Sequence, residues 1–286
     1  MLEALKGQIK ELLKAKKVEL VIGYQRANDG IAAIPYFMEK ASEAENLIWD
    51  AYCVYNLSKY LLEFPDKKKG IIAKPCDLKS LIVLLQENQL KREELFIIAV
   101  ECKGVADEKK NNAQGFPMKC KDCDLKIPKL YDVLIEDKEK KAKLETGYDE
   151  YEAIRKLEAK SIEERQRLWE EEFLRCIRCY ACRQICPMCY CPRCVAEQTM
   201  PAWFSKAGNL PGNLSWNVTR AMHLAGRCVD CGECERACPV GLPLRDIHKK
   251  IEKDVRELFN YEAASDIAQK PLFSSFDKND PDAFIR

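Results

Sequence analysis

The pattern of apolar and polar positions divides the chain into two halves. In the first half, compact apolar runs typical of buried strands alternate with segments whose apolar residues recur at helical spacing. The expected helices are 2–16, 43–63 and 77–89, and the expected strands are 18–25, 31–38, 70–74 and 95–102. The alternation of strands and helices of these lengths predicts a small α/β domain with a mostly parallel sheet.

The second half is helical in pattern. It begins with a highly charged stretch at 138–175, which we interpret as a solvated helix that bridges two domains. A later amphipathic helix is expected to start at Asn213 or Ser215 and to end at Gly226, and another follows at 242–260. The expected buried face of the first consists of Trp216, Ala221, Met222, Leu224 and Ala225.

Cysteines are concentrated between the charged stretch and these helices. Seven of them fall within the nineteen residues 176–194, and the spacing C-x2-C-x2-C-x3-C-P begins at Cys176 and recurs from Cys228. In paired runs of this kind, three thiolates hold one [4Fe-4S] cluster and the fourth cysteine reaches the other cluster. Disulfides or zinc are the alternatives. We therefore expect one cluster on Cys176, Cys179, Cys182 and Cys238, and a second on Cys228, Cys231, Cys234 and Cys186.

The expected fold class is α+β, with a small α/β N-terminal domain followed by an α-helical dicluster ferredoxin domain. Helices around both clusters resemble the α-helical ferredoxin of succinate-dehydrogenase-type iron–sulfur subunits. The final segment has little helical period, so it either packs on its own domain or docks into a neighbouring subunit. The expected parts are an α/β iron–sulfur domain at 1–145, a charged helical connector at 146–175, the dicluster domain at 176–262 and an extended tail at 263–286.

Composition limits the classes of function. The net charge of +1 over 286 residues gives no sign of a nucleic-acid partner. The N-terminus is a charged amphipathic helix and not a signal peptide, and no apolar run approaches the roughly 18 residues of a membrane span. We therefore expect a cytoplasmic protein whose sixteen cysteines bind metal. His223 and His248 are expected at the surface or in packing, and common nucleophile, zinc-protease and nucleotide-loop motifs are absent.

A further group of cysteines follows the predicted strands. Cys76 and Cys102 each come just after a strand, at the edge where open α/β sheets bind ligands. Cys120 and Cys123 form a C-x2-C pair in a later loop. These four thiolates could converge on a third cluster, and a zinc site or scattered buried cysteines are the alternatives.

A family resemblance favours the third cluster. The segments AKPCDLKSLIVLLQ, IIAVECKGV and CKDC resemble the deazaflavin (coenzyme F-420) hydrogenase and dehydrogenase beta-subunit family. The resemblance implies that Cys76, Cys102, Cys120 and Cys123 hold a [4Fe-4S] cluster. The run CIRCYACRQICPMCYCPRC is also similar to the dicluster segment of deazaflavin-linked formate dehydrogenase beta subunits, and similar subunits occur with heterodisulfide-reductase-type, flavin-bifurcating complexes.

The chain departs from this family in one respect. Members that use flavin have a long segment after the C-x2-C pair that helps to hold FAD and the deazaflavin. Here only about fifty residues separate Cys123 from Cys176, and most of them belong to the charged stretch. We therefore doubt that this chain binds its own FAD.

Four cysteines are left over: Cys53, Cys189, Cys191 and Cys194. The last three form a dense C-x-C-x2-C run, and thiolates so close repel each other unless a metal neutralises them. Cys53, in a segment of predicted helix, could supply a fourth ligand. We expect a fourth iron–sulfur cluster, with zinc or no site as the alternatives.

Three functions follow from these patterns. The first is a non-catalytic subunit that relays single electrons through three or four [4Fe-4S] clusters in a strictly anaerobic oxidoreductase complex. Its partners would be a catalytic dehydrogenase or hydrogenase subunit and a flavin or heterodisulfide-reductase-type subunit. The second is a flavin-containing subunit that oxidises or reduces the deazaflavin. The third is a zinc-binding interaction module, against which the paired ferredoxin runs argue.

Overall fold

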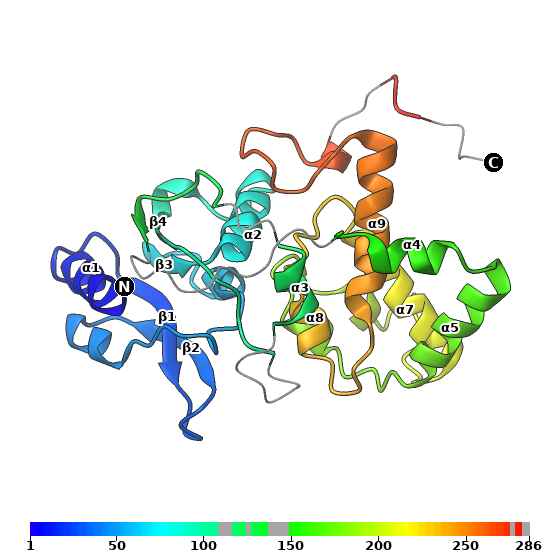
Figure 1. Ribbon diagram of the computed structural model, residues 1–286, viewed down its shortest axis with the longest axis horizontal. Helices are drawn as coiled ribbons and strands as arrows, with labels where there is room; N and C mark the ends of the chain where they lie inside the picture. The colour runs from blue at the N-terminus through cyan, green and yellow to red at the C-terminus, as the bar shows by residue number, and fades with distance from the viewer. Residues whose placement is uncertain (108–115, 124–126, 137–148, 275–277, 282–286) are drawn as a thin grey trace. The chain divides into compact units, whose positions relative to one another are not determined.

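The computed structural model describes residues 1–107, 116–123, 127–136, 149–274 and 278–281. The chain divides into two compact units, which we call the sheet unit and the helical unit. The sheet unit comprises Met1–Tyr148 and Ala264–Gln269, and the helical unit comprises Asp149–Ala263 and Lys270–Arg286. Figure 1 labels most of their helices and strands.

The sheet unit is built on a five-stranded sheet in the order β2-β1-β3-β4-β5. The strands are β1 Leu20–Arg26, β2 Ala33–Met38, β3 Lys69–Ala73, β4 Leu95–Val100 and β5 Val133–Ile135. All run parallel to their neighbours except β2, which pairs antiparallel with β1. The prediction of a mostly parallel sheet is therefore confirmed. Pro35 lies in β2 at the edge of the sheet, where proline is tolerated.

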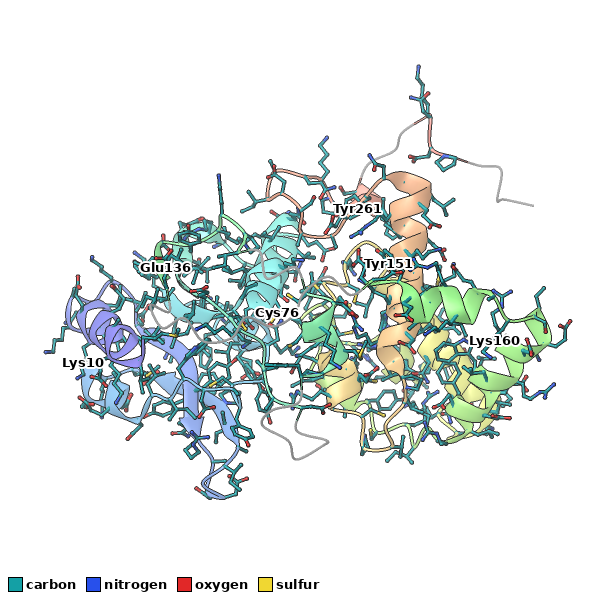
Figure 2. The ribbon with its side chains drawn as sticks, in the orientation of Figure 1. Lys10, Cys76, Glu136, Tyr151, Lys160 and Tyr261 are labelled. Atoms are coloured by element: carbon teal, nitrogen blue, oxygen red, sulfur yellow. The ribbon has the colours of Figure 1, made fainter. Side chains whose placement is uncertain are left out.

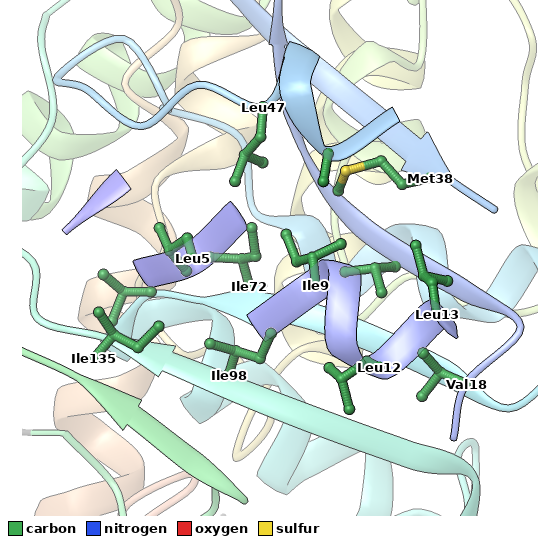
Figure 3. Packing of buried hydrophobic residues seen from close by; sticks show 13 residues of the cluster. Leu5, Ile9, Leu12, Leu13, Val18, Met38, Leu47, Ile72, Ile98 and Ile135 are labelled. Carbon is green, nitrogen blue, oxygen red and sulfur yellow. The ribbon is translucent and has the colours of Figure 1, made fainter. Parts of the chain in front are cut away.

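Helices cover both faces of this sheet. Helix α1, Leu2–Lys14, packs its apolar side chains on one face, in a cluster of 13 buried residues (Figure 3). Because successive side chains of a strand alternate, Ile71 and Ile97 point to the opposite face. Helix α2, Pro75–Gln86, packs there against β3 and β4. The sheet unit thus has an apolar core of its own.

The predicted helix at 43–63 is wrong. The structure has two 3-10 helices there, Ala41–Asn46 and Leu57–Glu63, separated by turns. In these turns the Asp50 carboxylate accepts a hydrogen bond from the backbone N–H of Tyr52 at 2.8 Å. Short polar side chains compete for backbone groups in this way and so interrupt a helix. The apolar residues that suggested the helix are buried along irregular backbone instead.

The helical unit confirms the helical character of the second half. Its helices are α4 Glu152–Glu158, α5 Ile162–Leu174, α6 Ala181–Gln184, α7 Leu210–His223, α8 Glu233–Arg236 and α9 Leu244–Phe259. Helix α4 packs against α9, α5 against α7, and α6 against α8. Within the described ranges, no helix is long and apolar enough to cross a membrane.

The charged stretch at 138–175 forms two helices, α4 and α5, where the structure describes it; its first part, up to residue 148, lies outside the described residues. Helix α4 is tied to α9 by polar contacts. The Tyr151 hydroxyl donates to the Glu252 carboxylate at 3.0 Å (Figure 2), and the Lys253 ammonium contacts both oxygens of Glu158 at 3.0 Å. These contacts hold part of the charged stretch within the helical unit.

The predicted start of α7 is wrong by one turn. The helix begins at Leu210, and the Asn209 side chain accepts from the backbone N–H of Gly212 at 3.0 Å as the N-cap. Asn213, the predicted cap, is instead buried inside the helix. Met222 was expected on the buried face and is exposed, whereas the other four residues of that face are buried.

The predicted tail contributes to both units. In its first part, the Gln86 side chain of the sheet unit donates to the backbone carbonyl of Asp266 at 2.6 Å. A 3-10 helix follows at Leu272–Ser274. Of the phenylalanines that suggested docking, Phe273 is exposed, and Phe276 and Phe284 lie outside the described residues.

Candidate metal centres

The two cysteine runs fold into the same kind of turn. In each run, the residues on both sides of the second cysteine have positive φ angles. They are Arg178 (57°) and Tyr180 (59°) in the first run, and Asp230 (54°) and Gly232 (70°) in the second. Residues with side chains seldom adopt this conformation, which clusters at functional sites. Each turn leads into a short helix, α6 or α8, and these two helices pack together.

One group of cysteines surrounds Cys182. The sulfur atoms of Cys176, Cys179 and Cys238 are near enough to influence the pKa of the Cys182 thiol, which burial raises. Cys176, Cys182 and Cys238 also belong to one apolar cluster. The structure thus brings together the four cysteines predicted for the first cluster, including the one from the distant second run.

A second group contains Cys186 and the remaining cysteines of the second run. Cys234 and Cys186 influence the pKa of Cys228, and Cys231 lies in the same turn. Burial raises the pKa of the Cys234 thiol to about 12 and that of Cys228 well above its ordinary value. Cys186 therefore reaches the second run, as the predicted exchange of ligands requires.

The chemistry of these buried thiols fits an iron–sulfur cluster. Burial raises the pKa of the Cys182, Cys228 and Cys234 thiols, so these three stay protonated at neutral pH, whereas only a thiolate binds metal. Iron cations at the site would favour the thiolate and release the proton, because metal binding and ligand ionisation are coupled. Without such cations, the burial of four thiols beside one another would contribute little to the stability of the fold.

Three polar residues of α7 support the cysteine turns, and the sequence analysis missed them. Asn213, Asn217 and Arg220 follow each other at helical spacing and so share one face of the helix. The Asn213 amide donates to the Cys176 carbonyl at 2.8 Å, and the Arg220 guanidinium donates to the Cys182 carbonyl at 3.0 Å. Asn217 lies 3.9 Å from the Cys176 sulfur. The signal in the sequence was that these three polar residues form a stripe along a predicted amphipathic helix.

The two histidines differ in burial and in environment. His248 is buried and its Nε2 lies 2.6 Å from the Arg220 guanidinium. Burial, with the adjacent positive charge, holds the pKa of His248 well below its usual value. His223 is exposed. One histidine thus serves in packing and the other lies at the surface, within the two expected roles.

A third group of cysteines lies in the sheet unit. The parallel strands β3 and β4 end at the same edge of the sheet, Cys76 lies in the first turn of α2 (Figure 2), and Cys102 follows β4. Helix α3, Met118–Lys121, carries Cys120. Cys102 influences the pKa of Cys76, and Cys120 and Cys123 influence that of Cys102, which burial raises to about 11. The structure therefore brings these four cysteines together.

A buried lysine lies beside this third group. The Lys74 ammonium is 3.0 Å from the Asp77 carboxylate and donates to the Tyr55 carbonyl at 2.8 Å. Burial disfavours its charge, but Asp77 and then the sulfurs of Cys76 and Cys102 raise the pKa of Lys74 above its ordinary value. The sequence analysis missed Lys74, although a charged residue between a buried strand and a cysteine was a visible signal.

The last four cysteines belong to different units. Cys53 is buried in a turn of the sheet unit, where its sulfur accepts from the backbone N–H of Asp50 at 3.4 Å and burial raises its pKa to about 12. Its predicted position in a helix is wrong. Cys189, Cys191 and Cys194 line one cavity of about 60 Å³ in the helical unit. A site that combines all four stays a prediction.

This cavity adjoins the second group of cysteines. The Cys189 thiol donates a hydrogen bond to Cys186, which lowers the pKa of Cys186. Arg183, Arg220 and Arg227 also line the cavity. Among the residues that the structure describes, no three His, Cys, Asp or Glu side chains close around a single metal ion.

A known protein family matches the region that contains the two cysteine runs. The family described as "4Fe-4S dicluster domain" matches residues 175–243, which include both runs and the helix between them. The chain carries a 4Fe-4S dicluster domain. At least two [4Fe-4S] clusters are therefore part of this protein.

Two curated relatives extend the similarity to nearly the whole chain. The F420-dependent formate dehydrogenase subunit beta of Methanocaldococcus jannaschii is 25% identical over 358 aligned positions, which cover 95% of this chain and 94% of the relative. The subunit beta of F420-dependent formate dehydrogenase 1 of Methanococcus maripaludis is 21% identical, with 94% and 92% covered. These relatives confirm the resemblance to the beta-subunit family. With the dicluster domain, they support an iron–sulfur electron-transfer subunit of an oxidoreductase.

Proposed function

We propose that this protein relays single electrons between a catalytic subunit and an acceptor subunit, through clusters in both of its units. The observation that carries the proposal is that Cys238 lies close to Cys182 of the first run and Cys186 lies close to Cys228 of the second run. A bound [4Fe-4S] cluster accepts and returns one electron, and its potential depends on charge, hydrogen bonds and exposure. The chain supplies the ligands, buries Cys182, Cys186, Cys231 and Cys238 among them, and orients donors towards the cysteine turns.

The ligand sets of the proposal are those of the sequence analysis. Cys176, Cys179, Cys182 and Cys238 hold the first cluster, and Cys228, Cys231, Cys234 and Cys186 hold the second. Cys76, Cys102, Cys120 and Cys123 hold a third cluster at the edge of the sheet. Support for the third comes from the mutual influence of its sulfurs on their pKa values.

For the fourth group, we propose a metal site on Cys189, Cys191 and Cys194, which line one cavity. Cys53 is the proposed fourth ligand. Its buried sulfur already accepts a backbone hydrogen bond, so metal binding would have to displace that bond. The proposed metal group at this site is an iron–sulfur cluster, with zinc as the alternative.

The partners and the compartment are also proposals. The relatives are named as beta subunits of formate dehydrogenases, and we propose that this chain joins a catalytic dehydrogenase or hydrogenase subunit in the cytoplasm of an anaerobic organism. Heterodisulfide-reductase-type or flavin subunits are the proposed acceptors.

The second candidate is a flavin-containing subunit that reacts with the deazaflavin coenzyme, which the family resemblance favours. Against it, the alignment with the first relative runs over 358 positions, more than the 286 residues of this chain. The relative therefore has segments that this chain lacks. This agrees with the short interval between Cys123 and Cys176, where flavin-using members have a long segment.

The test is the content of iron, zinc and flavin per chain in anaerobically purified protein, measured on wild type and on single cysteine variants. At four irons per cluster, four clusters require about sixteen irons and three about twelve. We expect Cys182→Ala and Cys102→Ala each to remove about four irons, from different clusters. Cys191→Ala and Cys53→Ala should both affect the fourth site if they share it.

The outcomes separate the candidates. Wild-type protein with twelve irons or more and no flavin supports the relay, whereas one flavin per chain favours the second candidate. Undamaged wild-type protein with about eight irons would contradict the third cluster, because two cubanes account for that number. If Cys53→Ala keeps all the metal that Cys191→Ala loses, Cys53 is not a ligand.

A further inference from the structure

Arg220 occupies a special position in the helical unit. It belongs to α7 and is almost fully buried, with 4% of its surface exposed. One guanidinium nitrogen donates to the backbone carbonyl of Cys182, in the first run, at 3.0 Å. The other lies 2.6 Å from Nε2 of buried His248 on α9. These two contacts fix the plane of the guanidinium.

The positive charge of Arg220 faces cysteines of both groups. Burial opposes this charge, but the sulfurs of Cys186, Cys234, Cys189 and Cys182 more than compensate and raise the pKa of Arg220 well above its ordinary value. Cys182 belongs to the first group, whereas Cys186 and Cys234 belong to the second and act more strongly. Arg220 therefore lies close to cysteines of both groups.

His248 adds no second positive charge at this position. Its pKa is held well below the usual range by burial and by Arg220, so the ring is neutral and its Nε2 can accept from the guanidinium. Arg220 thus keeps its charge at any pH at which the protein is folded.

One N–H group of Arg220 lacks a partner in the described part of the chain, although the guanidinium also hydrogen-bonds to the Cys189 side chain. Its Nε is buried and has no hydrogen-bond partner among the residues that the structure describes. A buried donor without a partner costs about 1–3 kcal/mol, and such orphans are rare in folded proteins. A cluster sulfur is an acceptor that fits here, because cysteines of the two groups surround the guanidinium.

We propose that Arg220 is a fixed positive charge between the two clusters of the dicluster domain and raises the reduction potential of both. We further propose that its Nε–H donates to a sulfur of the cluster held by Cys228, Cys231, Cys234 and Cys186. Both statements rest on the ligand sets proposed above. On reduction one electron enters, supplied by the donor subunit or by a chemical reductant. No bond to the protein forms or breaks, and Arg220 keeps its proton. Its charge offsets the added negative charge, which favours the reduced state.

The first experiment is a redox titration of the full-length, cluster-loaded protein, followed by electron paramagnetic resonance. Arg220→Gln should shift both midpoint potentials to more negative values. For the cluster on the Cys228 group, we expect the reduction equilibrium to weaken about tenfold, which is about 59 mV for one electron. The cluster on the Cys176 group should shift less. Arg220→Lys keeps the charge and should shift less than Arg220→Gln.

Arg167→Gln is the matched control. It removes the same charge from an exposed position on α5, where solvent and salt screen it, and should leave both potentials unchanged. A glutamine variant that keeps its iron and has wild-type potentials overturns the proposal. Fewer than about eight irons in wild type would instead contradict the ligand sets on which it rests.

A second measurement tests the proposed hydrogen bond first in wild-type protein. Wild-type protein is labelled with nitrogen-15 in its arginine guanidinium groups, reduced, and examined by pulsed electron paramagnetic resonance. We expect a nitrogen-15 coupling to the reduced cluster, transmitted through the Nε–H···S hydrogen bond. Its loss in Arg220→Lys would assign the coupling to Arg220. Absence of the coupling in labelled wild type would overturn the proposed hydrogen bond.

Discussion

The sheet unit and the helical unit reach their folds by different means. In the sheet unit, α1 and the strands bury a cluster of 13 apolar side chains that contains no cysteine (Figure 3). In the helical unit, Cys182 and Cys238 themselves form part of a small apolar cluster, and a second cluster is built around Val255 and Tyr261. The cysteines thus occupy positions where an ordinary domain has its core. We infer that the free energy of metal binding is a large part of the folding free energy of the helical unit.

The largest expected effect comes from removal of iron. Anaerobic chelation should unfold the helical unit and leave the sheet unit folded, because the main apolar core of the sheet unit contains no cysteine. Hydrogen exchange with mass spectrometry would show lost protection in α7 and α9 and retained protection in β1, β3 and β4. Equal loss of protection in both units would contradict this contrast.

Among substitutions in the sheet unit, a change at Lys74 should lower the free energy of unfolding most. Lys74→Met leaves the fully buried Asp77 carboxylate without its cation, which typically costs about 3–5 kcal/mol. The measurement is the free energy of unfolding of the sheet unit, from hydrogen exchange of the β3 amides. Lys69→Met is the matched control, because Lys69 is also buried but its carboxylate partner Glu94 lies 3.9 Å away and is partly exposed. An equal cost at both lysines would show that the ion pair with Asp77 is not what makes Lys74 sensitive.

In the helical unit, Asn213→Ala should lower the stability by about 1–3 kcal/mol, because the Cys176 carbonyl loses its side-chain donor. The buried Phe173 carbonyl also loses the Asn213 amide but keeps the backbone N–H of Cys176 at 3.1 Å. The temperature at which the cluster absorbance bleaches would report this loss. Asn217→Ala is the comparison, since its contact with the Cys176 sulfur is long at 3.9 Å. If Asn217→Ala lowers the bleaching temperature more than Asn213→Ala, the carbonyl contacts are not the main support.

The smallest effect is expected at the start of α5, away from the cysteines. The exposed Ser161 side chain accepts from the backbone N–H of Glu164 at 3.2 Å and caps the helix. Ser161→Ala should cost about 1 kcal/mol, measured by hydrogen exchange of the α5 amides, whereas Ser161→Asp should retain the cap. A change in iron content on Ser161→Ala would show that α5 contributes to metal retention.

The two units also differed in how far the sequence could predict their sites. In the dicluster domain, three ligands of each group lie within seven residues, so spacing alone indicated which cysteines belong together. In the sheet unit, Cys76 and Cys120 are far apart in the chain, and their grouping depended on two parallel strands that end at one edge. The strands themselves were predictable because apolar runs of this length have few other structures.

Predictions failed where short polar side chains decided the local backbone. At 43–63 the apolar spacing indicated a helix, but the turn at Asp50 interrupts it. At α7, Asn209 caps the helix one turn before the expected start, and Asn213 became a buried support for the first run. Asparagine and aspartate bond equally well to helix ends, turns and distant carbonyls, so their role depends on what folds beside them.

The sequence by itself determined the α+β class, the mostly parallel sheet and the pairing of two ferredoxin runs, because periodicity and ligand spacing are local properties. Only the tertiary structure decided which polar residues lie against the cysteines. Lys74 interacts electrostatically with the sulfurs of Cys76 and Cys102, and Arg220 does so with cysteines of both runs. Electrostatic influence acts through space and grows with burial, so residues far apart in the chain become neighbours only after the backbone has closed around them.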